Sequence, residues 1–519
     1  MAITSRRRES TTRAQAWALG LASAASFVVV LDLLVVATAL STIRRDLGAS
    51  IGELEWTVNA YTLTFAVLLM TAAAVGDRFG RRRVLAAGLG VFAVGSAACA
   101  LAPGTGALIA ARAVQGVGAA MVMPLALAVL NAAVPPQRRG WAMGIFGAVT
   151  ALAVVVGPVL GGAVTQGISW QWIFWINVPV ALLAIPLVLR RLAESYGPRA
   201  PLDLPGLALG TGAGLGLVWG LVRSSTVGWA SPEVIWVLAG GVVLAAGFAV
   251  RERRARAPML PLQLLRIRGF AAGNGAVFLL NAALTGVIFF TAQFLQVSLK
   301  LDPLGAGLRL LPWGVAPLLL APRAGRLADR VGERPLVSSG LVLLAAGFAW
   351  IAGIAGPGTP YWALLGAMVI SGAGLALAIP AVTRAVVGSV PPTAIGKATG
   401  AFSAMRQLGG AFGIAILAAV FAGAGSYASP AAFSAGYGAA VGAAAGLALA
   451  GAVVALALPA RTTAAQASGR PAAETPGDTA RTASTAQGSA PAAIAMAAAG
   501  TSAAEVNRAE ALGPEQVPL

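Results

Sequence analysis

Fourteen long runs of apolar residues divide the sequence, and each is long enough to cross a membrane as a helix. A crossing needs ~20 residues, because the hydrocarbon core is ~30 Å thick and a helix rises ~1.5 Å per residue. Only 10% of the 519 residues are charged, against about 25% in soluble proteins. We therefore predict an all-α integral membrane protein. The runs occupy residues 17–40, 56–75, 84–103, 106–131, 141–163, 172–189, 205–222, 233–250, 270–298, 304–322, 335–355, 361–388, 397–423 and 433–459.

The first six runs and the last six share landmarks that return at a nearly constant separation along the chain. These pairs are Asp77-Arg78-x-Gly80 with Asp329-Arg330-x-Gly332, Pro124 with Pro380, and Val134-Pro135-Pro136 with Val390-Pro391-Pro392. Such self-similarity indicates an internal repeat. We predict two homologous six-helix bundles with one inserted pair of helices between them, a 6 + 2 + 6 arrangement. The predicted parts are a segment 1–16, a bundle 17–189, a linker with the inserted pair 190–269, a bundle 270–459 and a disordered tail 460–519.

The basic residues predict the orientation of the chain. Its net charge is +18, and most of its 36 basic residues lie in short gaps between apolar runs. With the N-terminus in the cytoplasm, the only basic residues outside are Arg44, Arg45, Arg223 and Lys300. This is the positive-inside pattern of membrane proteins, and it explains the charge without a nucleic-acid partner. We expect a monomer in the cytoplasmic (inner) membrane, in contact with the lipid bilayer and with both termini in the cytoplasm.

We place four charged residues inside the membrane: Asp32, Arg112, Arg309 and Arg406. A charge at the membrane centre costs at least ~2.5–3.5 kcal/mol, so such a residue is a candidate functional group. The chain has no His, which excludes a His-based metal site or proton relay. Asp32 is the only acid that we place inside a span. We predict that Asp32 couples transport to protons and that Arg112 modulates it; the alternative is a fixed ion pair that holds two helices together.

Two local patterns predict moving parts. Asp77, at a helix end, is followed by Gly80 and by arginines from Arg81 onward, and a carboxylate among arginines and helix ends can form an ion-pair latch. Gly157-Pro158-x-x-Gly161-Gly162 combines glycines that permit close helix packing with a proline that bends the helix. The simpler readings are positive-inside anchoring for the first pattern and ordinary helix packing for the second.

Across residues 17–459 these motifs resemble the fourteen-helix drug:proton antiporter family of the major facilitator superfamily. The second half carries the superfamily's loop motif as Gly325-Arg326-Leu327-Ala328-Asp329-Arg330-Val331-Gly332, and the first half keeps Asp77, Arg78, Gly80 and Arg81 of it. Leu108-x3-Arg112-x2-Gln115-Gly116-x-Gly118 is similar to the fourth-helix motif, and Trp170 to Phe174 with Asn177-Val178-Pro179 is similar to the sixth-helix signature. Residues Gly157, Pro158, Gly161 and Gly162 match the antiporter motif.

The resemblance implies the major facilitator fold, with a substrate cavity at the membrane midplane between the two bundles. It implies that the loop motif holds the cytoplasmic side closed when the protein faces outward. It also implies a cavity lined by polar residues, and we predict these to be Asn59, Tyr61, Gln115, Asn281, Gln293, Arg309 and Arg406.

We therefore predict a proton-coupled antiporter that exports drugs, antibiotics or similar amphipathic small molecules, driven by the proton motive force without a cofactor. The alternatives are a dedicated exporter of one endogenous metabolite or self-made antibiotic, a symporter or importer, and a non-transporting membrane sensor. A nucleotide-driven pump is excluded, because Gly396-Lys397 is followed by Ala398 rather than by the Ser or Thr of a phosphate-binding loop. An enzyme is not expected.

Overall fold

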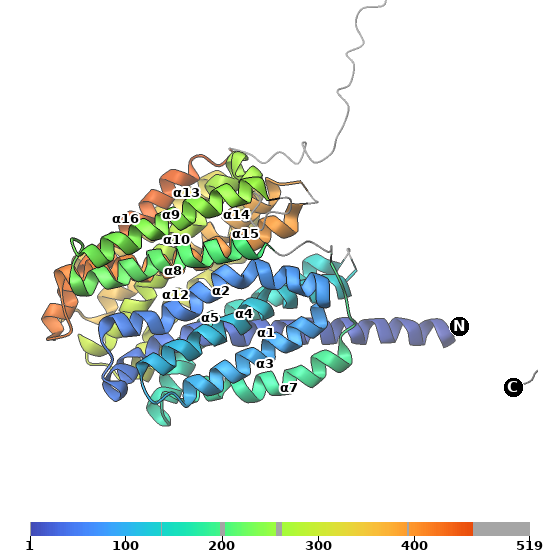
Figure 1. The fold of residues 1–519 in the computed structure, drawn as a ribbon, viewed down its shortest axis with the longest axis horizontal. Coiled ribbons are helices and arrows are strands. Elements are labelled where there is room, and N and C mark those ends of the chain that lie inside the picture. The colour runs from blue at the N-terminus through green and yellow to red at the C-terminus, as the bar shows by residue number, and fades with distance from the viewer. Residues whose placement is uncertain (1, 136–137, 198–202, 256–261, 392–393, 460–519) are drawn as a thin grey trace, which may run out of the picture. The chain divides into compact units, whose positions relative to one another are not determined.

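The computed structural model describes residues 2–135, 138–197, 203–255, 262–391 and 394–459, and no strand occurs within these ranges. The described residues contain 14 helices that are long and apolar enough to cross a membrane, which confirms the predicted number. The predicted disordered tail, 460–519, lies outside them. Figure 1 shows the helices packed side by side, and the N-terminal part of α1 extends beyond the other helices.

Two of the spans are broken rather than continuous. The sixth span consists of α6 (Trp172–Trp175) and α7 (Asn177–Arg191), and the tenth consists of α11 (Pro303–Arg309) and α12 (Leu311–Val331). Pro179 and Pro312 follow these breaks. Because proline has no N–H and its ring clashes with the preceding turn, it disfavours an uninterrupted helix there.

The remaining elements are α1 (Ala2–Leu47), α2 (Ile51–Phe79), α3 (Arg81–Ala100), α4 (Thr105–Ala133), α5 (Arg139–Gly167), α8 (Leu204–Val227), α9 (Pro232–Arg254), the 3-10 helix η2 (Leu262–Arg266), α10 (Arg268–Val297), α13 (Glu333–Ile354), α14 (Tyr361–Gly388), α15 (Ile395–Ala424) and α16 (Pro430–Ala455). We call α1–α7 the first half and α10–α16 the second half. The end of the bundle where α1 passes into α2 is called the α1–α2 end, and the opposite end the α2–α3 end.

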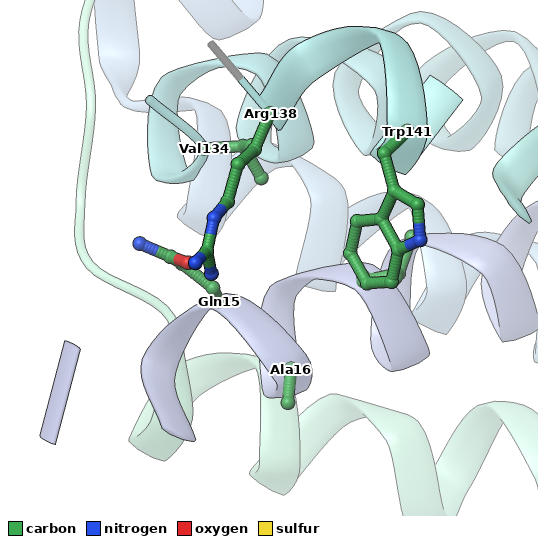
Figure 2. Close-up of a pocket in the computed structure, with 6 residues that line it drawn as sticks. Gln15, Ala16, Val134, Arg138 and Trp141 are labelled. Carbon is green, nitrogen blue, oxygen red and sulfur yellow. The ribbon is translucent and has the colours of Figure 1, made fainter. Parts of the chain in front are cut away.

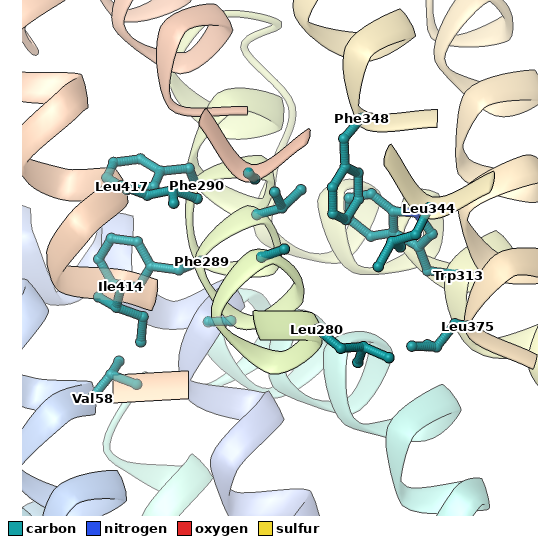
Figure 3. Close-up of a cluster of buried hydrophobic side chains, with 14 of the residues drawn as sticks. Val58, Leu280, Phe289, Phe290, Trp313, Leu344, Phe348, Leu375, Ile414 and Leu417 are labelled. Atoms are coloured by element: carbon teal, nitrogen blue, oxygen red, sulfur yellow. The ribbon is translucent and has the colours of Figure 1, made fainter. Parts of the chain in front are cut away.

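Apolar side chains of both halves meet in one large buried cluster. Its members in the second half include Phe289 and Phe290 of α10 and Ile414 of α15, and it also takes in Val58 of α2. Figure 3 shows Val58 beside Ile414 and next to Phe289. Since burial of each large apolar side chain contributes ~1.5–3 kcal/mol, this cluster holds the two halves together along the α2–α15 seam.

The inserted pair packs on the outside of that same seam. Val218 and Val222 of α8 form a small buried cluster with Leu63 of α2 and with Ala411 and Ala415 of α15. Helix α9 packs against α8, and its large apolar residues Ile235, Trp236, Val242 and Val243 are exposed, as expected of a surface that faces lipid. One inserted helix therefore touches both halves, while the other forms the periphery.

The described contacts between the halves concentrate at the α1–α2 end. Gln296 of α10 donates to the carbonyl oxygen of Thr38 in α1 at 3.0 Å. Gln166 of α5 donates to Asp302 at 3.3 Å and accepts from the backbone N–H of Leu304 at 3.2 Å. The guanidinium of Arg44 lies 4.0 Å from the ring centroid of Tyr427. This conformer is thus closed at the α1–α2 end.

At the α2–α3 end a pocket opens within the first half, between the start of α1 and the start of α5. It is lined by Gln15, Ala16, Leu19, Val134, Arg138 and Trp141. In Figure 2 the side chains of Arg138 and Trp141 point toward α1 near Gln15 and Ala16. Trp141 is 64% exposed, so an aromatic side chain stands open at this end of α5.

Candidate functional site

Asp32 lies at the centre of a hydrogen-bond network that is buried inside the first half. Its Oδ2 is 2.6 Å from Nη1 of Arg112, and its Oδ1 accepts hydrogen bonds of 2.7 Å from the side-chain amides of Gln115 and Asn177. All four side chains are 0% or 1% exposed. Three helical spans therefore converge on one carboxylate: Asp32 comes from α1, Arg112 and Gln115 from α4, and Asn177 from the start of α7.

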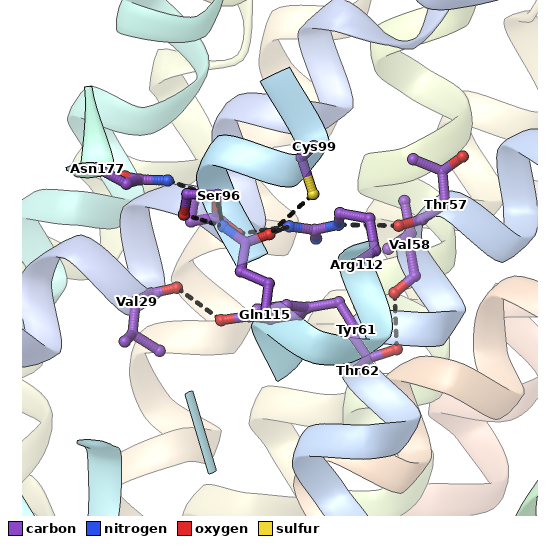
Figure 4. A network of polar contacts seen from close by, with 11 residues as sticks. Val29, Thr57, Val58, Tyr61, Thr62, Ser96, Cys99, Arg112, Gln115 and Asn177 are labelled. Carbon is purple, nitrogen blue, oxygen red and sulfur yellow. Dashed lines mark hydrogen bonds and ion pairs between the residues drawn. The ribbon is translucent and has the colours of Figure 1, made fainter. Parts of the chain in front are cut away.

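Arg112 is held from several sides at once. Its Nε donates to the carbonyl oxygen of Thr57 in α2 at 3.0 Å, and Nη1 also donates to Oε1 of Gln115 at 2.6 Å. The guanidinium carbon lies 4.3 Å from the ring centroid of Tyr61 and 5.7 Å from that of Phe174, which is within the range of cation–π attraction. Figure 4 shows Arg112 between Thr57 and Gln115. Nη2 is buried and has no hydrogen-bond partner among the described residues.

The structure places two predicted cavity residues inside this network. Gln115 uses its amide for Asp32, Arg112 and the hydroxyl of Ser96 at 2.8 Å, and it accepts from Cys99 at 3.7 Å. The ring of Tyr61 faces Arg112, and its hydroxyl donates to the carbonyl oxygen of Val29 at 3.1 Å. Both side chains are fully buried. In this conformer they position the Asp32–Arg112 pair, and their assignment to the cavity wall stays a prediction.

The energetics of this network favour a paired, charged state. Burying two ions without partners costs several kcal/mol each, and removing one partner of a buried pair typically costs about 3–5 kcal/mol. Two amides and a guanidinium compensate the Asp32 carboxylate. A carboxylate that changes partners between two conformers is a physical basis for proton coupling.

The loop motif of the first half forms a tight corner between α2 and α3. Gly80 has φ +107° and links the two helices, a backbone conformation that favours glycine. Nε of Arg81 lies 2.7 Å from Oδ1 of Asp77. The segment after α7 crosses this corner: the backbone N–H of Gly197 donates to the carbonyl of Asp77 at 3.0 Å, and that of Arg81 donates to the carbonyl of Ser195 at 2.9 Å.

Glu194 adds a contact at this corner that the sequence reasoning missed. Its carboxylate accepts a 2.8 Å hydrogen bond from the backbone N–H of Arg82, and it lies 3.5 Å from Nε of Arg82 and 3.7 Å from Nε of Arg83. A carboxylate at the N-terminal turn of α3 compensates the positive end of that helix. Among the described residues Asp77 contacts Arg81 and the segment after α7, while Arg78 is exposed.

The second copy of the loop motif is described only in part. Gly332 has φ +87° and links α12 to α13 as Gly80 links α2 to α3, and Arg330 is exposed. The side-chain surroundings of Gly325 and Asp329 lie outside the described residues. The backbone of the second corner therefore repeats that of the first.

The glycines of the predicted antiporter motif make close contacts on two sides of α5. A Cβ on Gly157 would lie 2.8 Å from Cβ of Leu34, and one on Gly161 would lie 2.5 Å from the carbonyl oxygen of Val35, both in α1. A Cβ on Gly162 would lie 2.3 Å from the carbonyl oxygen of Pro303 in the second half. The contact is mutual, because a Cβ on Gly307 would lie 2.2 Å from the carbonyl oxygen of Pro158. This motif thus forms the closest approach of α5 to α1 and to α11.

The other predicted cavity residues are dispersed. Asn281 donates to the carbonyl of its own helix at Val277, and Gln293 donates to that at Phe289. Arg309 ends α11, donates to its own helix at Gly305 and lies 5.3 Å from the ring centroid of Tyr361. Nε of Arg406 in α15 and both polar atoms of the Asn59 side chain in α2 are buried without hydrogen-bond partners among the described residues. The structure thus does not gather them into one site in this conformer.

A second fully buried acid lies in the first half, outside the apolar runs read from the sequence. Glu55 lies in the second turn of α2, inside the span Ile51–Phe79, and its side chain is fully buried. Glu55 lies one residue before the predicted span 56–75, because hydropathy alone does not define where a helix begins or enters the membrane. Asn177 was part of a recognised motif, but nothing in the sequence indicated that its amide reaches Asp32.

Comparisons with known proteins agree with this architecture. The model of the Major Facilitator Superfamily matches residues 22–262 and 274–505. The tetracenomycin C resistance and export protein of Streptomyces glaucescens is 34% identical over 420 residues, which cover 80% of this chain and 77% of that protein. The puromycin resistance protein pur8 of Streptomyces alboniger is 36% identical and covers 79% of this chain and 82% of its own length. The cephamycin export protein CmcT of Amycolatopsis lactamdurans is 36% identical over 462 residues, or 87% of this chain and 94% of that protein.

Solved structures show the same fold at low sequence identity. The crystal structure of the peptide transporter POT in complex with sulfate has a TM-score of 0.63 at 16% identity and covers 85% of this chain and 94% of its own. A POT family transporter in complex with a thioalcohol conjugated peptide has a TM-score of 0.65 at 15% identity, with coverage of 84% and 94%. These likenesses concern the fold alone. Together with the family match and the 14 membrane-length helices, they show that this chain belongs to the Major Facilitator Superfamily and is a multi-pass membrane transporter rather than an enzyme.

Proposed function

We propose that this transporter exports antibiotics or similar amphipathic small molecules from the cytoplasm in exchange for protons. The observation that carries the proposal is the buried Asp32–Arg112 pair, held by Gln115 and Asn177 inside a membrane-length bundle. The relatives of the chain are resistance and export proteins for tetracenomycin C, puromycin and cephamycin. A drug exporter needs an energy source, and an ionisable carboxylate in the membrane supplies the coupling to a proton gradient.

The positive-inside pattern supports an orientation with both termini in the cytoplasm. The α1–α2 end is then extracellular, and the conformer described above is closed on the extracellular side. In this conformer Asp32 is ionised and paired with Arg112. When the halves rock to open the α1–α2 end, the Asp32 contacts rearrange and the carboxylate takes up a proton from outside. Proton release toward the cytoplasm then restores the ion pair and resets the cycle.

Transport into inside-out membrane vesicles tests this function directly. The extracellular face of the protein lines the lumen of such vesicles, so an acid lumen is expected to drive puromycin inward and a protonophore is expected to stop it. Uptake that follows the puromycin gradient and ignores the pH gradient would contradict proton coupling. A diverse panel of compounds then separates a multidrug exporter from one dedicated to a single metabolite, and the absence of transport for the whole panel would favour a sensor.

The loop motif contributes a latch in this cycle. Among the described residues Asp77 contacts Arg81 and the segment after α7, and we propose that it engages the second half when the cytoplasmic side closes. We expect Asp77→Asn to abolish puromycin export while the protein still reaches the membrane in normal amount, as measured by vesicle uptake and immunoblotting. Glu233→Gln is the matched control, because Glu233 forms an exposed pair with Arg223 on the inserted helices, where such pairs contribute only ~0–1 kcal/mol. Normal export by Asp77→Asn would exclude the latch.

A further inference from the structure

Glu55 is a second embedded acid, and its surroundings differ from those of Asp32. Its side chain is fully buried, and neither Oε1 nor Oε2 has a hydrogen-bond partner among the described residues. No described cation lies within ion-pair distance of it. Asp32, in contrast, has a guanidinium and two amide donors on its two oxygens. The two acids of the first half therefore stand in opposite environments within one conformer.

The charged and titratable groups near Glu55 have other contacts. Arg44 of α1 stacks on Tyr427, whose hydroxyl donates to Oε1 of Gln293. Arg112 of α4 approaches α2 at the carbonyl of Thr57 but points to Asp32. Glu53 forms the capping box at the start of α2 and accepts from Thr105. Near the same end of α1, Arg45 donates to Thr42 and Asp46 accepts from Trp170. Other such groups on the helices that pack against α2 include Cys99 of α3, Arg223 of α8, which pairs with Glu233, and Lys397 and Arg406 of α15; Nε of Arg406 has no hydrogen-bond partner among the described residues.

Asn59 shares the face of α2 that carries Glu55. Residues four apart lie one above the other on a helix, so the amide of Asn59 is the next polar group along that face. Both of its polar atoms are fully buried and have no partner among the described residues. Tyr61 marks the face of α2 that meets Arg112, and Leu63 marks the face that meets α8 and α15. The face of Glu55 and Asn59 lies between these two, next to Val58, which packs against Ile414 across the seam (Figure 3).

A buried carboxylate without a partner is unstable as an anion. Its ionised form costs several kcal/mol in a membrane interior, whereas the protonated form is neutral and carries its own donor. A protonated Glu55 and the amide of Asn59 are each able to donate and accept, so a small rearrangement or a water molecule would connect them. The site is therefore built for a neutral carboxyl that is exchangeable with an ion.

We propose that Glu55, with Asn59 beside it, is a second proton-binding site on the seam between the halves, and that it is occupied when the α1–α2 end is closed. This inference rests on the proposed exchange of protons for substrate and deepens it. While Asp32 is ionised against Arg112, Glu55 keeps its proton, and opening of the seam exposes Glu55 to solvent and allows exchange. The consequence is that Glu55 exchanges a proton with the extracellular side each time the seam opens, while Asp32 carries the proton that crosses the membrane.

Infrared spectroscopy of the full-length protein in lipid vesicles tests the site without any substrate. At neutral pH the wild type is expected to show the carbonyl-stretch band of a protonated carboxylic acid, and Glu55→Gln is expected to lose it. Glu53→Gln is the matched control, since Glu53 lies two residues away outside this face and keeps the capping box as a glutamine. Glu55→Asp should retain a shifted band, which shows that the loss in Glu55→Gln comes from the carboxyl group. A band that persists unchanged in Glu55→Gln would overturn the proposal.

Thermal unfolding gives a second, independent measurement. Because glutamine resembles a protonated glutamate, Glu55→Gln should unfold at the wild-type temperature or above it at neutral pH. The unfolding temperature of the wild type should fall as the pH is raised, since the folded protein holds a proton that the unfolded chain releases. The fall in unfolding temperature with rising pH should be smaller in Glu55→Gln, because this variant lacks the proton that the wild type releases from position 55 on unfolding. A destabilised Glu55→Gln with the same pH dependence as the wild type would show that Glu55 is ionised and would also overturn the proposal.

Transport then separates this proposal from the proposed function. If both hold, Glu55→Gln still couples puromycin uptake to the pH gradient, but its uptake rate depends less on the luminal pH than that of the wild type, since the seam then opens without exchange of a proton at position 55. The same dependence of the uptake rate on luminal pH in the two proteins would overturn the role of Glu55 in the cycle. If the infrared band depends on Glu55 but wild-type uptake ignores the pH gradient, the proton site stands and the antiport function fails.

Discussion

Replacing Asp32 by Asn is expected to abolish proton-driven export completely, the largest effect of any single substitution in this protein. Asparagine preserves the size of the side chain but cannot take up and release a proton. In inside-out vesicles, puromycin uptake by Asp32→Asn should no longer respond to an acid lumen, while exchange of puromycin down its own gradient continues. Uptake that still rises with the pH gradient would show that Asp32 is not the coupling site.

The alternative of a fixed ion pair makes a different prediction. Asp32→Asn leaves the buried Arg112 without its counter-ion, which would cost about 3–5 kcal/mol of stability if the pair were only structural. The double variant Asp32→Asn with Arg112→Gln removes both charges and should restore much of that stability, as measured by thermal unfolding. If the pair is only structural, the double variant also recovers export driven by the pH gradient. If Asp32 carries the proton, stability returns and coupling does not.

Replacing Gly162 by Ala is expected to shift the protein away from the conformer that is closed at the α1–α2 end. The added Cβ would lie 2.3 Å from the carbonyl oxygen of Pro303, so α5 and α11 must separate. Overpacking of this kind costs about 1–3 kcal/mol, which corresponds to a roughly 5- to 150-fold change in the ratio of two conformers. Export should fall accordingly, because a cycle that cannot close this end cannot reset.

Labelling of an introduced cysteine measures the shift. Thr38 is fully buried at the closed end, and its carbonyl accepts from Gln296 across the seam. The measurement uses a protein with the substitutions Cys99→Ala and Thr38→Cys. Its single cysteine should react faster with a maleimide when Gly162→Ala is added. Gly240→Ala is the matched control, since a Cβ there would meet nothing within 4 Å on the inserted helix α9. Equal labelling rates in the two variants would show that this contact does not hold the end closed.

Much of the fold is readable from the sequence because it depends on local and repeated properties. The length and apolar character of each run set the number of spans, and the number was confirmed. Gly80 and Gly332, recognised as copies in the repeat, both adopt a positive φ at equivalent corners. The breaks within the sixth and tenth spans were not predicted, since hydropathy continues across Pro179 and Pro312 while the helical hydrogen bonds do not.

The candidate site was predictable only in its charged members. Asp32 and Arg112 are conspicuous because charge within an apolar run is costly, and the structure brings them to 2.6 Å. Gln115, Tyr61 and Asn177 carry no such signal, since a polar group in a helix often bonds only to its own backbone. Asn281 bonds only to its own helix, whereas Gln115 bonds to Asp32 in another helix. The position of each residue in the sequence does not show which of the two it does.

The sequence by itself determined that this protein is a membrane-embedded, doubled bundle with an inserted pair of helices and a carboxylate inside its first span. These properties follow from the composition, the length of the apolar runs and the internal repeat, all of which are read along the chain without knowledge of distant contacts. Only the tertiary structure decided that Asn177 completes the network of Asp32, that Gly162 meets Pro303, and that Glu55 lies without a partner on the seam. The rotation of each helix about its axis and its depth in the bundle depend on packing against helices far away in the sequence, and these two quantities determine which polar side chains meet.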